Sequence, residues 1–97
     1  MDLSDPLECG PCYQLYTDSF YKTCMQKLAP GGIFATQSGC AAIHDCHQGV
    51  FTAVNNTLKQ AFPLVLPYTC YVPSFSSEWG WNLAFKDEGV NPAERFA

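Results

Sequence analysis

The sequence has few basic residues and no long hydrophobic run. Only five of its 97 residues are Lys or Arg, against nine Asp or Glu, and the formal net charge is −4 at pH 7. Because nucleic-acid binding depends on clusters of basic side chains, this composition argues against a nucleic-acid partner. No apolar stretch approaches the roughly 20 residues that a membrane-spanning helix needs. No signal-peptide pattern is visible either, so we expect no membrane partner and a cytoplasmic location.

The sequence also lacks a G-x-G-x-x-G motif, the common glycine-rich loop that binds dinucleotides. Gly31 and Gly32 follow Pro30, and this combination is expected to end a helix. Apolar residues are plentiful: 47% of the chain is hydrophobic and 14% is aromatic. Such a composition supports a packed core and argues against disorder. The length suits one small domain or part of a larger one.

Helical and strand patterns alternate along the chain. Apolar residues recur every three or four positions in two segments, and short apolar or alternating runs follow them. We expect helices over residues 13–28 and 47–61, strands over 33–37, 64–72 and 81–85, a loop over 38–46 and a turn over 73–77. This order, helix-strand-helix-strand-strand, predicts an α/β fold whose last two strands pair antiparallel. It matches the C-terminal half of a methyltransferase-like Rossmann fold.

The apolar positions indicate which face of each element is buried. The expected stripe of the first helix is Tyr16, Phe20, Cys24 and Leu28. That of the second helix is Val54 and Leu58, continued by Val50 or Phe51 and by Ala61 or Phe62. The apolar run at 33–37 is typical of a buried parallel strand. Pro67 has no N–H to donate, so the strand over 64–72 is expected at an edge or with a bulge.

Cys9 and Cys12 form a C-x-x-C motif, which raises the possibility of thiol chemistry. A redox dithiol needs a depressed thiol pKa, and Cys12 does precede a predicted helix. However, a thioredoxin-like fold needs a strand and a helix before the motif, and only eight residues precede Cys9. A zinc site is a second alternative, with ligands from Cys9, Cys12, Cys40, His44, Cys46 or His47. The later residues lack the regular second pair of zinc motifs, so we favour incidental thiols, mostly reduced.

Carboxylates offer a different chemistry at the same place. Asp2 and Asp5 form a D-x-x-D-P motif, and Glu8 adds a third acid. Ligands of open α/β sheets lie beyond the carboxyl ends of the strands, so we expect this loop, Gln37 and the turn over 73–77 to gather at one edge. The turn brings aromatic residues that can hold an alkyl chain or a cation, namely Phe75, Trp79 and Trp81.

Four segments of the chain resemble the polyamine aminopropyltransferases, the spermidine and spermine synthase family. They are D-L-S-D-P-L-E-C-G-P-C-Y-Q-L-Y-T-D-S-F-Y at 2–21, L-A-P-G-G-I-F-A-T-Q-S-G at 28–39, N-N-T-L-K-Q-A-F at 55–62 and Y-T-C-Y-V-P-S-F-S-S-E-W-G-W at 68–81. The first and last are most similar to the thermospermine synthase branch. The resemblance implies that residues 1–86 are a partial catalytic domain and that 87–97 are a polar C-terminal segment.

The resemblance implies a transfer of the aminopropyl group of decarboxylated S-adenosylmethionine, a co-substrate, to a polyamine. Asp2 matches the general base, Asp5 the acid that binds an ammonium group, and Gln37 a position beside the polyamine. No metal or other cofactor is implied. The methyltransferases share the fold but lack this D-x-x-D-P motif.

Two further positions and one departure follow from the same resemblance. Pro11 and Cys12 match the loop against the adenine of the donor. Phe75 stands where spermidine synthases carry a tyrosine, which leaves the choice among spermidine, spermine and thermospermine as product open.

The glycine-rich loop and the N-terminal β-hairpin domain of the family have no counterpart here. We therefore expect a chain that is inactive and poorly folded by itself, from an enzyme that forms homo-oligomers. The alternative is a non-catalytic remnant that binds polyamine or pairs with a full-length relative.

Overall fold

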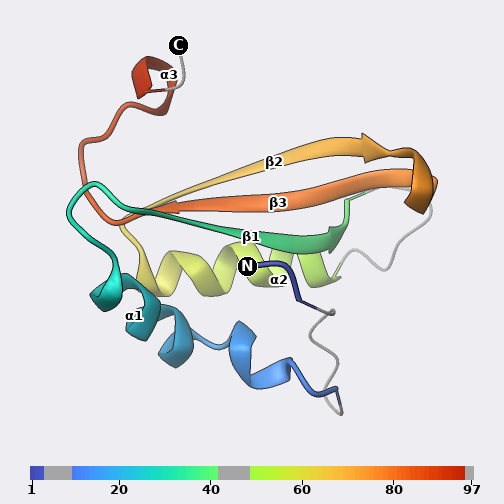
Figure 1. The fold of residues 1–97 in the computed structure, drawn as a ribbon, viewed down its shortest axis with the longest axis horizontal. Helices are drawn as coiled ribbons and strands as arrows, with labels where there is room; N and C mark the ends of the chain where they lie inside the picture. The colour runs from blue at the N-terminus through green and yellow to red at the C-terminus, as the bar shows by residue number, and fades with distance from the viewer. Residues whose placement is uncertain (4–9, 42–48, 96–97) are drawn as a thin grey trace.

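The computed structural model describes residues 1–3, 10–41 and 49–95. Its elements are the 3-10 helix η1 (Tyr13–Tyr16), α1 (Asp18–Lys27), β1 (Ile33–Cys40), α2 (Gly49–Ala61), β2 (Leu64–Val72), the 3-10 helix η2 (Pro73–Phe75), β3 (Ser77–Phe85) and the short α3 (Pro92–Arg95) (Figure 1). The order of helices and strands agrees with the predicted α/β fold. No helix in the described ranges has the length and apolar character to cross a membrane.

The three strands form one sheet in the order β1-β3-β2. β3 is the central strand and pairs antiparallel with both neighbours. The predicted antiparallel pairing of the last two strands is therefore confirmed, and so is the edge position of Pro67, since β2 has only one neighbour. An edge strand is the usual place for a proline in a sheet.

The prediction of a parallel strand at 33–37 is wrong for the β1–β3 ladder, which is antiparallel. On the other edge of β1, Met1 donates from its nitrogen to the Ala35 carbonyl and accepts from the Gln37 N–H. Met1 thus bonds to the two residues that flank Thr36, which is the hydrogen-bond pattern of parallel strands. β1 also extends to Cys40, beyond the expected strand, through a bulge at Gly39 (φ +79°).

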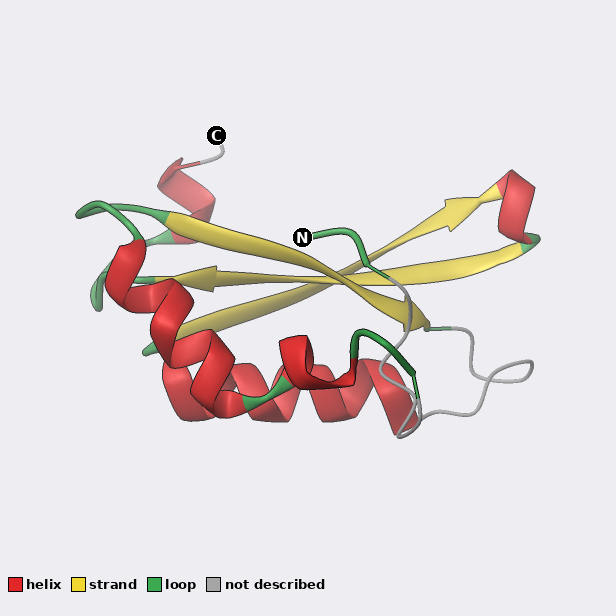
Figure 2. Cartoon of the chain, turned by 60° about the horizontal axis from the view of Figure 1, so that its bottom comes forward, coloured by secondary structure: helices red, strands yellow, loops and turns green. Residues whose placement is uncertain are grey.

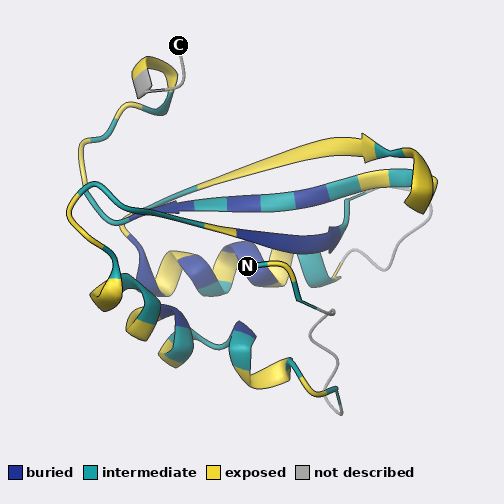
Figure 3. Cartoon of the chain, in the orientation of Figure 1, coloured by how far each residue is buried: buried dark blue, intermediate teal, exposed yellow. Residues whose placement is uncertain are grey.

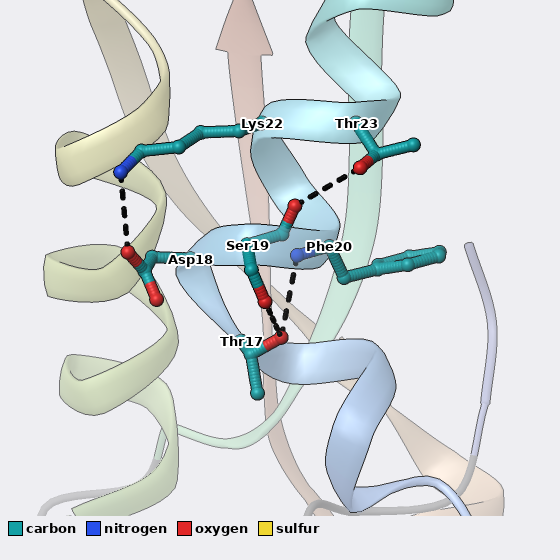
Figure 4. Close-up of polar contacts among 6 residues, drawn as sticks. All are labelled: Thr17, Asp18, Ser19, Phe20, Lys22 and Thr23. Atoms are coloured by element: carbon teal, nitrogen blue, oxygen red, sulfur yellow. Dashed lines mark hydrogen bonds and ion pairs between the residues drawn. The ribbon is translucent and has the colours of Figure 1, made fainter.

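The first helix differs from its predicted bounds because the chain breaks at Thr17. Thr17 is extended (φ −96°, ψ 156°), and its hydroxyl oxygen accepts a hydrogen bond from the Phe20 N–H at 3.3 Å (Figure 4). This is an N-cap, which satisfies one of the free N–H groups of the first turn. Asp18 then pairs with Lys22 one turn later, at 3.3 Å. A 3-10 turn and α1 thus replace one continuous helix over 13–28.

α1 and α2 both lie on the same side of the sheet (Figures 1 and 2). In α2, Val54, Leu58 and Ala61 of the expected stripe are at most 9% exposed, as is Phe62 directly after the helix. Val50 and Phe51 are only partly buried. In α1 the fully buried residue is Tyr21, whereas the predicted Phe20, Cys24 and Leu28 are only partly buried. The shift follows from the cap at Thr17, because α1 starts anew there.

The two faces of the sheet are unequal. Burial alternates along β3 (Figure 3): Gly80, Asn82 and Ala84 are buried, while Trp79, Trp81 and Leu83 are only partly buried. Asn82 accepts a hydrogen bond from the Asn55 side chain of α2 at 2.7 Å and donates to the Ser38 hydroxyl at 2.8 Å. No described helix covers the other face, which we call the open face.

The ring of Phe51 in α2 explains why a glycine, Gly80, lies between the two tryptophans of β3. A Cβ atom at this position would lie 2.1 Å from the ring of Phe51 in α2. We expect Gly80→Ala to lower the free energy of unfolding by about 1–3 kcal/mol, because the helix must move away from the sheet. Urea denaturation measures this change. Gly49→Ala is the control, since no atom lies within 4 Å of its added Cβ; equal losses in both variants would contradict the packing argument.

Tyr21 is 0% exposed, and its hydroxyl has no hydrogen-bond partner in the described part of the chain. Burial, with smaller contributions from Tyr16 and Cys24, raises the pKa of Tyr21 well above its ordinary value. The Tyr21 hydroxyl therefore ionises at a lower pH in the unfolded chain than in the folded one. As a result, the free energy of unfolding falls as the pH rises above about 10. We expect Tyr21→Phe to stabilise the protein by about 1 kcal/mol at neutral pH.

The same variant should lose less stability than the wild type between pH 9 and 11, because the titrating group is gone. Thermal unfolding across this range measures both effects. Tyr13→Phe is the control, since Tyr13 is 45% exposed. A Tyr21→Phe protein that is less stable than the wild type at neutral pH would show that the hydroxyl has a partner.

Candidate functional site

A cleft of about 540 Å³ lies on the open face of the sheet. It is lined by Met1, Asp2, Leu3, Ala35, Gln37, Tyr68, Phe75, Trp79 and Trp81. These residues come from five places: the N-terminal segment, β1, β2, η2 and β3. Asp2, Gln37 and Phe75 of the predicted 73–77 turn line this one cleft. The cleft lies on the open face of the sheet, whereas the prediction placed these residues at an edge. A volume of this size is typical of small-molecule sites.

Asp2 enters the cleft because of how Met1 pairs with β1. Met1 lies opposite Thr36 in a parallel bridge, and Thr36 is buried on the helix side of the sheet. Side chains alternate along an extended segment, so Asp2 falls on the same side as Gln37, the open face. Its side chain is exposed, and no hydrogen bond or ion pair engages its carboxylate within the described ranges. This carboxylate can therefore accept a proton or pair with a cation.

Aromatic rings form the walls of the cleft. Tyr68 and Trp81 are stacked, with ring centres 5.5 Å apart and planes 14° apart. Phe75 and Trp79 meet at 4.6 Å with planes tilted by 47°. Phe75 is 55% exposed, so its ring is open to a ligand. Ring faces attract cations, and the rings also offer apolar surface to methylene groups.

Gln37 connects the parts of the site. Its Nε2 donates to the Leu3 carbonyl at 2.6 Å and to the Tyr16 hydroxyl oxygen at 3.1 Å. Its Oε1 accepts from the Trp79 indole N–H at 3.0 Å and from the Gly39 N–H at 2.9 Å. The side chain is only 5% exposed. This amide therefore holds the segment after Asp2 and the ring of Trp79 in fixed positions relative to β1.

Two residues of this arrangement carried no signal of their own in the sequence. Tyr16 was expected only in the helix core, but its hydroxyl also donates to the Leu3 carbonyl at 3.2 Å. Tyr68 lay within a predicted strand without an assigned role. The hairpin register could have identified it, because Tyr68 and Trp81 are equally far from the turn and therefore pair across the strands.

The remaining predicted site residues lie apart from the cleft or outside the described part of the chain. Pro11 is exposed, and Cys12, which precedes η1, packs against the core; neither lines the cleft. Asp5 lies outside the described residues, as does Glu8. The roles of Pro11, Cys12 and Asp5 therefore stay predictions.

The thiols do not form a metal site among the residues that the structure describes. Cys12, Cys24 and Cys70 are free, and burial raises the pKa of the Cys24 thiol, which makes its thiolate scarcer. Cys40 differs from the expectation of reduced thiols because it is in a disulfide. The other residues of the zinc alternative, Cys9, His44, Cys46 and His47, lie outside the described residues.

Residues 1–94 match the spermine/spermidine synthase domain family. The chain is 54% identical over 88 residues to the thermospermine synthase ACAULIS5 of Arabidopsis thaliana. This match covers 90% of this chain and 26% of that protein. It is 41% identical over 86 residues to a polyamine aminopropyltransferase of Synechococcus, and this match covers 89% of this chain and 27% of that protein. The chain thus spans about a quarter of the length of these curated relatives.

Solved structures agree with these sequence matches. The spermidine synthase of Thermotoga maritima superposes with a TM-score of 0.72 at 24% identity, over 88% of this chain and 28% of that one. A spermidine synthase in complex with the transition-state analogue AdoDATO gives a TM-score of 0.72 at 25% identity, over 87% and 28%. The predicted fold, the C-terminal half of a methyltransferase-like Rossmann fold, is thus confirmed.

The network of Gln37 predicts a clear effect on stability. Gln37→Leu keeps the approximate size but leaves the Leu3 carbonyl, the Trp79 N–H and the Gly39 N–H without this partner. Because one buried polar group left unpaired costs about 1–3 kcal/mol, we expect a loss of at least about 2 kcal/mol in the free energy of unfolding. Urea denaturation measures it. Gln26→Leu on the exposed face of α1 is the control; a comparable loss there would contradict a special role of Gln37.

Proposed function

Since the chain belongs to the spermine/spermidine synthase family, we propose that it forms the acceptor side of an aminopropyltransferase. The complete enzyme would move the aminopropyl group of decarboxylated S-adenosylmethionine to a polyamine. The observation that carries this proposal is the cleft, which places the exposed carboxylate of Asp2 among four aromatic rings. A carboxylate beside aromatic faces suits a flexible, multiply charged alkylammonium ligand.

The charge of the chain supports a cationic ligand. Its net charge is −4, and Asp2 forms no ion pair with a described residue. An exposed ion pair contributes little by itself, so a polyamine needs several anchors. We assign one ammonium group to Asp2, a second to Asp5 and the methylene chain to Phe75 and Trp79. Gln37 would act beside them by holding the site together.

The reaction would be a direct displacement at the carbon next to the sulfonium sulfur of the donor. The lone pair of an acceptor nitrogen forms the new N–C bond, and the electrons of the broken C–S bond stay on sulfur, which becomes a neutral thioether. An alkylammonium group titrates near the lysine value of about 10.4, so the neutral nucleophile is scarce at pH 7. Asp2 would take the proton from nitrogen as attack proceeds. The cleft contributes the alignment of the two reactants.

The donor would lie on the side of the D-x-x-D-P segment, where Pro11 and Cys12 are the proposed neighbours of the adenine. Phe75 has no hydroxyl to bond an amine, and we propose that this favours an acceptor held by apolar contact over one held by hydrogen bonds. Because the chain spans about a quarter of its relatives' length, we propose that it has no turnover by itself.

The proposal is tested in a hybrid in which residues 1–95 replace the matching segment of the Arabidopsis thermospermine synthase. We expect the hybrid to transfer an aminopropyl group from decarboxylated S-adenosylmethionine to a triamine, with the product detected by mass spectrometry. Asp2→Asn should lower kcat at least about 100-fold, because the proton acceptor is lost while the shape is kept.

Asp87→Asn is the matched control, since Asp87 does not line the cleft. It should leave kcat unchanged. A folded hybrid without any turnover would contradict the proposed function and favour a non-catalytic polyamine-binding chain. If the Asp2→Asn hybrid is as active as the parent hybrid, the proposed transfer activity is supported, but Asp2 is not its proton acceptor.

A further inference from the structure

Three neighbouring side chains form a row across the open face. Trp81 of β3 pairs with Gln37 of β1 on one side and with Tyr68 of β2 on the other. Directly opposed residues of adjacent strands point to the same face, so these side chains stand next to one another. The N-terminal segment, which carries Asp2, adds a fourth member beyond Gln37. The cleft is therefore a trough that runs across the strands, from Asp2 to Tyr68.

The far end of the trough is an aromatic wall. Tyr68 is 42% exposed and stacks on Trp81, with ring centres 5.5 Å apart. The Tyr68 hydroxyl makes no hydrogen bond to a described residue, so its ring is not held by a polar network. β2 is an edge strand of the described sheet, so no further described strand pairs with its outer side. A stacked pair with one accessible partner can bind a cation and the methylene groups beside it.

The length of the trough can be compared with that of the acceptor. Three strand spacings of about 4.8 Å separate the N-terminal segment from β2, which gives a trough of about 14 Å. A four-carbon diamine has five bonds of about 1.5 Å, and its contour is at most about 7.5 Å. A triamine with three- and four-carbon spacers has nine such bonds, and its contour is at most about 13.5 Å. With one end at Asp2, only the triamine extends along the trough to Tyr68.

We propose that Tyr68, stacked on Trp81, binds the distal ammonium group of a triamine acceptor and thereby selects triamines over diamines. This inference rests on the proposed function, because it places the reacting amine at Asp2. Tyr68 would contribute through the face of its ring, and its hydroxyl would be dispensable. The pair is thus a specificity-determining feature, distinct from the residues that handle the proton.

The test is a comparison of acceptors in the same hybrid enzyme. Tyr68→Leu should raise KM for the triamine spermidine about threefold to tenfold, because the cation loses one aromatic face. KM for the diamine putrescine should not change; where putrescine is not turned over, its inhibition constant is measured instead. Tyr68→Phe should retain the wild-type preference, because the ring remains. Circular dichroism checks that each variant is folded.

Tyr71→Leu is the matched control. Tyr71 lies on the same strand and is 56% exposed, but it does not line the cleft. It should leave both constants unchanged. Equal changes for spermidine and putrescine, or none, in Tyr68→Leu would overturn the inference while the transfer activity of the hybrid still supports the proposed function. A folded hybrid that transfers nothing to any amine would overturn both.

Discussion

The arrangement of the site depends on one buried amide, that of Gln37. Hydrogen bonds of this side chain join the segment after Asp2, the hydroxyl of Tyr16, the indole of Trp79 and the bulge at Gly39. A buried amide is stable only when its polar atoms are paired, so the positions of these groups constrain one another. The carboxylate of Asp2 and the aromatic wall are thereby placed on the same face, although they lie far apart in the sequence.

The second constraint is the one-sided sheet. Because β3 lies between β1 and β2, its small or polar residues Gly80, Asn82 and Ala84 face α2, and its tryptophans face away. The Asn82–Asn55 hydrogen bond and the close approach of Phe51 to Gly80 fix α2 against this side. The open face is thus left to large aromatic side chains. The same packing that builds the core thus supplies the aromatic surface of the proposed site.

Much of the fold follows from local patterns. The alternation in β3, the edge position of Pro67 and the buried stripe of α2 were predictable, because each reflects the period of its own element. The start of the first helix was not predictable, because the sequence does not distinguish a threonine that caps a helix from any other polar residue. The cap is recognised only from the hydrogen bond between the Thr17 side chain and the Phe20 N–H. The parallel pattern of β1 was also misleading, since a short apolar run cannot tell which strand will be its neighbour.

By itself, the sequence determined the class of the fold, the family and five residues that meet in the cleft: Asp2, Gln37, Phe75, Trp79 and Trp81. It could do so because these residues sit in motifs whose order along the chain is informative. Only the tertiary structure decided that Gln37 is buried and bonded to Trp79 and to the segment after Asp2. These bonds depend on the pairing of β1 with β3 and with the N-terminal segment. That pairing is set by contacts between distant segments, which no local pattern contains. The register that places Tyr68 beside Trp81, in contrast, follows from the position of the hairpin turn.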